Sequence, residues 1–182
     1  MSGRSRRGRI GATLLVALAL VGCSTMPSPP SAVGENFPGT CTPPQFAWPS
    51  DFIESLPGET EGIGTIVGLR LEYLDDDSWA WRVRSPDARE DFFGERVNDP
   101  SHGREVFLDA QTLGVIATQE VELTEAEQNL TKSAYDAAQE SGETWPSPLI
   151  VEMARVMDDG RAVWQLTMCD TATTELSVVT VR

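Results

Sequence analysis

Apolar and polar residues alternate along several short stretches of this chain, and the alternation predicts β-strands. From Ile63 to Leu74 apolar residues largely alternate with polar or small ones, and in Trp79–Arg84 the alternation is strict. A period of two places alternate side chains on opposite faces, so these stretches predict a hairpin around Asp75–Ser78. Further strands are predicted at Arg104–Asp109, Leu113–Gln119, Pro148–Val156, Ala162–Met168 and Glu175–Val181. The polar stretch Ser85–Gly103 predicts a long loop.

Two segments have the pattern of helices instead. Thr124 and Glu127 form a capping box, apolar residues follow at helical spacing, and Gly142 is suited to end the helix. A shorter helix is predicted over Ser50–Leu56, capped by Ser50 and ended by the Pro-Gly pair that follows it.

The predicted elements recur along the chain. Asp75, Asp76, Trp81, Val83 and Asp87 correspond to Asp158, Asp159, Trp164, Leu166 and Asp170, each pair offset by 83 residues. Each copy reads as a helix, a strand, an acidic turn and a strand with a tryptophan. We therefore expect an α+β fold of two small modules, in which a helix packs on an antiparallel β-sheet.

The first copy resembles a PepSY domain. The resemblance rests on the Trp-x-Val strand and on the stretch 104–116, which contains an Asp-Ala-x-Thr turn at Asp109–Thr112. The family favours glycine at the position of Leu113, and the second copy lacks the Asp-Ala pair. The resemblance implies PepSY-like modules at 46–120 and 121–182. It also implies extracytoplasmic interaction modules without catalytic residues, some of which are associated with proteases.

The N-terminus has the features of a lipoprotein signal. Four arginines precede an apolar run that ends in Leu20-Val21-Gly22-Cys23, a lipobox pattern. The run of about a dozen residues is shorter than the roughly 20 that a membrane-spanning helix needs. We expect cleavage after residue 22, a diacylglyceryl anchor on Cys23 and a Ser/Pro-rich tether over 23–45. The protein is then extracytoplasmic, on the outer face of the cytoplasmic membrane. The alternative is an ordinary signal with an incidental cysteine, and Arg6-Arg7 leaves twin-arginine export open.

The charge excludes one class of partner. Residues 1–22 contain four arginines and no acidic residue, so cleavage changes the net charge from −14 to −18. Such an acidic chain is unsuited to nucleic acid, which binds basic surfaces. Two other cysteines, Cys41 and Cys169, predict a disulfide outside the cytosol; two free thiols are the alternative.

The sequence offers no catalytic signature. His102 is the single histidine and lies in a polar stretch, so neither a Ser-His pair nor a zinc site is indicated. The Asp75–Asp77 and Asp158-Asp159 clusters lack the ligand spacing of a calcium loop and are typical of turns. We therefore expect a protein that is not an enzyme and that has no metal and no cofactor.

Trp79, Arg82 and Arg84 are the candidate partner-binding residues. Trp79 shares a strand face with Trp81, and the two rings are interpreted either as core anchors or as an exposed aromatic strip. We expect a non-catalytic module that binds an envelope protein or protease. The alternative is a lipoprotein that binds a small ligand or cation beside a transporter or sensor.

Overall fold

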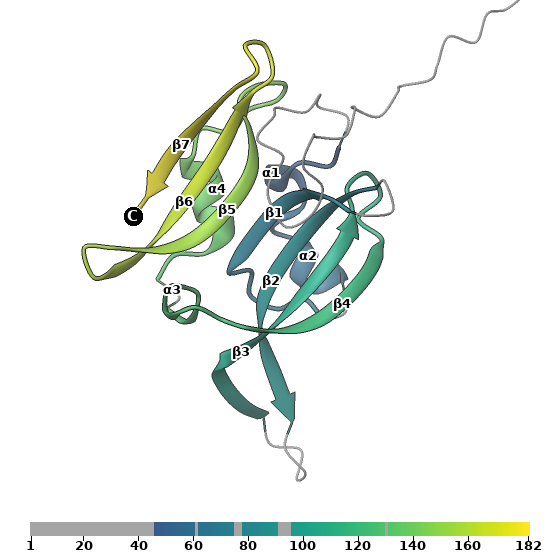
Figure 1. Cartoon of the computed structure of the whole chain (residues 1–182), viewed down its shortest axis with the longest axis vertical. Coiled ribbons are helices and arrows are strands. Elements are labelled where there is room, and N and C mark those ends of the chain that lie inside the picture. Colours follow the sequence, from purple (N-terminus) through teal and green to yellow (C-terminus); the bar gives the residue numbers. More distant parts are fainter. Residues whose placement is uncertain (1–45, 61, 75–77, 91–95, 130) are drawn as a thin grey trace, which may run out of the picture.

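The computed structural model describes residues 46–182 except 61, 75–77, 91–95 and 130 (Figure 1). The signal segment, Cys23 and the tether lie outside the described residues. The strands are β1 (Gly68–Tyr73), β2 (Trp79–Glu90), β3 (Arg96–Asp109), β4 (Val115–Glu122), β5 (Leu149–Asp158), β6 (Arg161–Asp170) and β7 (Glu175–Val181). The helices are short: α1 (Pro49–Phe52), α2 (Leu56–Glu59), α3 (Glu125–Gln128) and α4 (Ala134–Glu140). None of the described helices is long and apolar enough to cross a membrane.

All seven strands form one antiparallel sheet in the order β4-β3-β2-β1-β5-β6-β7. The two halves of the chain meet where Gly68–Arg70 of β1 pairs with Glu152–Ala154 of β5. The expected α+β class is confirmed as a sheet-dominated fold, but the structure has one sheet where the sequence predicted two. Pairing of β1 with β5 explains the difference, since it gives each strand a second hydrogen-bonded neighbour.

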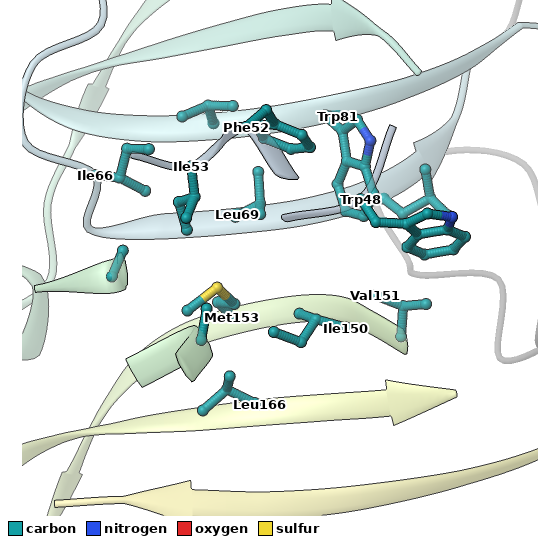
Figure 2. Packing of buried hydrophobic residues seen from close by; sticks show 14 of the residues in the cluster. Trp48, Phe52, Ile53, Ile66, Leu69, Trp81, Ile150, Val151, Met153 and Leu166 are labelled. Carbon is teal, nitrogen blue, oxygen red and sulfur yellow. The ribbon is translucent and has the colours of Figure 1, made fainter. Parts of the chain in front are cut away.

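A single hydrophobic cluster joins the two halves behind this sheet. Helix α1 contributes Phe52, whose ring lies tilted against that of Trp81 of β2 at a centroid distance of 5.8 Å. Met153 of β5 and Leu166 of β6 belong to the same cluster (Figure 2). Helices α1, α2 and α4 lie on this side of the sheet (Figure 1). The alternating strand pattern therefore gives one apolar face, covered by these helices, and one polar face.

The two tryptophans at the predicted repeat positions are held alike. The indole N–H of Trp81 donates to the carbonyl of Ala47 at 2.8 Å, and that of Trp164 donates to Lys132 at 3.0 Å. Both rings are fully buried, and each acceptor lies just before a helix of its own half. A buried indole needs such an acceptor, so the two halves use the same device to fix the chain before a helix.

The predicted long loop and the predicted long helix are both wrong. Strands β2 and β3 continue through most of Ser85–Gly103 as a ribbon that projects from the sheet (Figure 1). The helix that begins at the Thr124 capping box ends at Gln128, and a second helix begins after Ser133. The backbone carbonyls of Asn129 and Lys132, between the two helices, accept hydrogen bonds from Arg155 of β5. In a continuous helix these carbonyls would accept backbone N–H groups of the next turn. Here they accept the Arg155 guanidinium instead, so a tertiary contact replaces the helical hydrogen bonds.

The turns follow their local chemistry. Asp159 and Gly160 both have positive φ, as a two-residue type I′ hairpin requires, and they connect β5 to β6. At the next turn Asp170 accepts backbone N–H groups from Ala172 and Thr173, and Asp109 accepts from Gln111 and Thr112 in the turn after β3. The two turns are thus stabilised in the same way, although the second lacks the Asp-Ala pair.

Candidate functional site: the polar face of the sheet

The face opposite the main helices has a ladder of charged side chains across four strands. In β1 Leu69 and Leu71 point into the core, so Arg70 and Glu72, which alternate with them, lie on the other face. The same alternation in β2 and β3 places Arg82, Arg84 and Glu105 on that face, and β5 contributes Glu152. We call these residues, together with Glu127 of α3, the polar face.

Consecutive members of the ladder form ion pairs. Glu72 lies 3.1 Å from Arg82, Arg82 lies 3.4 Å from Glu105, and Arg84 lies 3.5 Å from the same Glu105 carboxylate. Arg84 also contacts Glu127 at 2.8 Å, while Gln119 of β4 donates to Glu105 at 2.6 Å. Opposite charges that face each other across strands stabilise a sheet. The side chains of Glu72 and Glu105 are 3% and 5% exposed, so these pairs are screened less than ordinary surface pairs.

Arg70 occupies the junction between the two halves of the sheet. Its Nε lies 3.7 Å from Glu72 on its own strand and 3.6 Å from Glu152 on β5. Glu152 is also within 3.4 Å of the Thr167 hydroxyl on β6. The ladder therefore crosses the β1–β5 boundary and joins both halves on this face, as the hydrophobic cluster does on the other.

A hollow of about 210 Å³ opens in the polar face beside α3. Its lining includes Gly68 and Ala154, which lie directly opposite each other in the β1–β5 register. Longer lining side chains come from Arg70, Arg84 and Glu127, among others. Two small residues at paired positions leave space between long charged neighbours, and this accounts for the hollow.

The structure places the three candidate partner-binding residues on different faces. Trp79 is 2% exposed and packs against Phe46 and Tyr73 at ring distances of 5.6 and 5.3 Å. It belongs to the core, and the interpretation of an exposed aromatic strip is wrong for Trp79 and Trp81. Arg82 and Arg84 lie on the polar face with 17% and 23% of their side chains exposed. Their role in binding stays a prediction.

The cysteines are only partly described. Cys169 is buried in β6 and is disulfide-bonded. Cys41, its expected partner, and Cys23 lie outside the described residues, so the Cys41–Cys169 pairing and the lipid anchor stay predictions.

The other candidate residues are accounted for by local structure. His102 lies in β3 opposite Glu122, in contact with the Ser101 hydroxyl at 3.1 Å, and not in a loop. Asp158 forms an ion pair with Arg182 at 2.7 Å beside a larger hollow of about 800 Å³. The residues 75–77 lie outside the described residues. Among those described, no group of three or more His, Cys, Asp or Glu is placed to hold a metal ion.

One partly buried carboxylate connects the two halves of the chain at their helices. Glu143, between α4 and β5, accepts the backbone N–H of Ser50 at 2.8 Å and that of Ile150 at 2.7 Å. Burial raises the pKa of Glu143, with the neighbouring Asp51 charge acting in the same direction, against the lowering effect of these hydrogen bonds. No local pattern indicates this contact, because Ser50 and Glu143 are 93 residues apart.

Comparison with known proteins gives little further information. No protein-family model and no curated protein matches this chain. One solved structure, described as a "putative lipoprotein" from Clostridium difficile 630, matches with 16% identity and a TM-score of 0.34. The match covers 74% of this chain and 94% of that one. A likeness at this level supports no argument about function.

Proposed function

We propose that this chain is a membrane-anchored extracytoplasmic lipoprotein that binds another envelope protein and has no catalytic activity of its own. The observation that carries the proposal is the polar face. Three arginines lie on a broad sheet surface that α1, α2 and α4 leave uncovered, and cross-strand ion pairs fix them in place. Fixed side chains lose little entropy on binding, so such a surface is suited to recognition.

The remaining parts of the proposal come from the sequence. Residues 1–22 act as the signal, Cys23 carries the diacylglyceryl group, and 23–45 hold the folded part away from the membrane. The units 46–120 and 121–182 are PepSY-like modules fused through the β1–β5 pair. The equivalent hydrogen bonds of Trp81 and Trp164 support this duplication.

Anchoring is tested separately from binding. Cys23→Ala should move the protein from the membrane fraction to the culture medium or a soluble fraction, because two acyl chains supply the stable anchor. Unchanged membrane retention of the variant would refute the lipid anchor.

Binding is tested by crosslinking the tagged lipoprotein in cells and identifying the captured proteins by mass spectrometry. We expect one dominant envelope protein that Arg82→Gln loses and that the matched variant Arg161→Gln retains. Arg161 is an exposed arginine at the β5–β6 hairpin, away from the polar face. Both variants must first show a wild-type circular dichroism spectrum and melting temperature within about 5 °C of wild type. Equal capture by folded Arg82→Gln would count against the polar face as the binding surface.

The hollow beside α3 favours a second candidate, a lipoprotein that binds a small ligand for a transporter or sensor. In that case a ligand raises the melting temperature of the purified protein, and crosslinking captures no dominant partner.

A further inference from the structure

Trp145 is the one tryptophan of the chain that does not belong to the core. Its exposed fraction is 69%, the highest among the exposed large hydrophobic residues of the described part, whereas each of the other four tryptophans is at most 2% exposed. Hydrogen bonds fix the loop that carries it. The Thr144 N–H donates to the Pro148 carbonyl at 3.0 Å, and the Thr171 hydroxyl donates to the Pro146 carbonyl at 3.0 Å. The ring is therefore held in solvent by a loop that is tied to the turn after β6.

This loop lies at the end of the sheet where the tether joins the folded part. Cys169, two residues before the turn after β6, is disulfide-bonded, and its predicted partner Cys41 belongs to the tether. At the same end the N–H of Ala47 donates to the carbonyl of Ala110, just after β3. The stretch from Cys23 to Cys41 spans at most about 60 Å when fully extended. A lipid anchor on Cys23 therefore brings this end of the sheet to the membrane first.

The surface around Trp145 carries no charge. The loop 144–148 and the turn 171–174 contain no charged residue, in a mature chain of net charge −18. The acids that flank them, Glu143 and Asp170, each accept two backbone N–H groups, so both charges have partners within the fold. Leu176, which is also exposed, follows the turn by two residues. We call the loop 144–148 and the turn 171–174 the Trp145 corner.

The chemistry of the ring and of its surroundings indicates what this corner contacts. An indole has an apolar body and one polar N–H, and tryptophan is enriched where a lipid layer meets water. Exposed acids, Asp51 and Glu175 among them, lie nearby, and they favour zwitterionic over anionic headgroups. Charges more than about 8 Å from the lipid are largely screened at physiological salt, so the rest of the acidic chain does not prevent the contact.

We infer that the Trp145 corner rests on the membrane surface, with the indole of Trp145 in the interfacial layer of the lipid. The inference rests on the proposed lipid anchor and adds a second contact to it. One ring binds a lipid surface weakly by itself, but the anchor makes the contact intramolecular and raises its effective concentration. The contact also orients the protein, because the ribbon of β2 and β3 at the other end of the sheet then points away from the membrane (Figure 1).

The test uses the fluorescence of the purified mature chain, because Trp145 alone among its tryptophans is open to a quencher. The Cys23 thiol is coupled chemically to a maleimide lipid in phosphatidylcholine vesicles whose acyl chains are either brominated or unmodified. We expect the coupled wild type to lose emission in the brominated vesicles and Trp145→Phe to lose none. Chemical coupling does not depend on whether cells acylate Cys23, so a failure here is separate from a failure of the proposed anchor.

A matched control moves the exposed ring to the other end of β5. Trp145→Phe combined with Met157→Trp places an indole at a position that is 43% exposed in the wild type, and its emission should be equal in both kinds of vesicle. Circular dichroism checks that both variants are folded. Equal emission of the coupled wild type in both kinds of vesicle overturns the inference, and so does equal quenching at positions 145 and 157. If Trp145→Gln then also loses the partner captured in cells, the ring belongs to the protein interface instead.

Discussion

Arg155 is the residue whose replacement tests most directly how the segment between α3 and α4 is held against the sheet. Its side chain leaves β5 on the core side, and its guanidinium lies 4.9 Å from the centre of the Trp164 ring. It donates to the carbonyls of Asn129 and Lys132, which lie between α3 and α4. Burial removes part of the hydration of the Arg155 charge and so lowers the pKa of this group.

The expected effect of Arg155→Met follows from these contacts. Methionine keeps an unbranched apolar side chain against Trp164 but removes the donors. Hydrogen bonds from a charged group contribute about 1.5–3 kcal/mol each, and the interaction with the ring adds about 0.5–2 kcal/mol. The hydration regained when the charge is removed offsets part of this total. In the variant the Lys132 carbonyl still accepts the indole N–H of Trp164, so the carbonyl that loses its hydrogen bond from Arg155 without a replacement is that of Asn129. We expect a loss of about 2 kcal/mol in the free energy of unfolding, roughly 30-fold in the folding equilibrium.

Urea denaturation of the mature chain measures this loss, and hydrogen exchange locates it. The backbone amides of Asn129 and Ala137, which donate to the carbonyls of Ala126 and Ser133, should lose protection first, because they flank the segment that Arg155 holds. Arg161→Met, an exposed arginine on the neighbouring strand, should change stability by less than about 0.5 kcal/mol. If Arg155→Met were as stable as Arg161→Met, the break between the two helices would have to be set by its local sequence, and the tertiary explanation would be refuted.

Three further predictions concern single positions. Trp81→Phe removes the donor to the Ala47 carbonyl and should lower the free energy of unfolding by about 1–3 kcal/mol in denaturant titrations; a change below 0.5 kcal/mol would contradict the role of this bond. Gly103→Ala would place a Cβ 2.9 Å from a backbone carbonyl oxygen and should cost about 1–3 kcal/mol by the same assay, whereas a neutral effect would show that β3 can shift. Burial raises the pKa of Asp109, but hydrogen bonds, the first of them from the Thr112 backbone, lower it below its ordinary value of 3.8 on balance. The ionised Asp109 carboxylate therefore stabilises the folded chain above pH 3.8, and this stabilisation is lost as the pH falls through the pKa that Asp109 has in the folded state. The difference in the free energy of unfolding between wild type and Asp109→Asn should therefore shrink on acidification. A difference that stays constant with pH would contradict this.

The sequence predicted those features that depend on neighbouring residues. The alternation in Trp79–Arg84 identified a strand, the strand predicted at Glu175–Val181 is β7, and the capping box at Thr124 is present as expected. The equivalence of Trp81 and Trp164 also held, since both are buried and donate to a backbone carbonyl just before a helix. These signals are local because strand pleat and helix caps are fixed within a few residues.

The features that depend on distant residues were missed. The helix was correctly predicted to begin after Thr124. The length of this helix, however, depends on Arg155, which lies outside the stretch with helical spacing. Likewise, nothing local indicates that β1 pairs with β5, which lies about 80 residues later. The polar face was partly visible in the alternation of Arg70 with Glu72 around Leu71. The partners of these charges, however, follow from the register between strands, and a shift of one residue would place them in the core.

The polar face also explains how an acidic chain can present arginines in a fixed arrangement. Exposed arginines on long side chains would lose several rotamers on binding, at about 0.5–1.5 kcal/mol each. Here Glu72 and Glu105, both almost completely buried, hold Arg82 from two neighbouring strands, so part of that entropy is lost on folding. Buried ion pairs of this kind add little net stability compared with apolar residues of similar size. If this sheet face served stability alone, apolar residues could replace these ion pairs. Their position at the junction of the two halves, on the sheet face that α1, α2 and α4 leave uncovered, is better explained by binding than by folding.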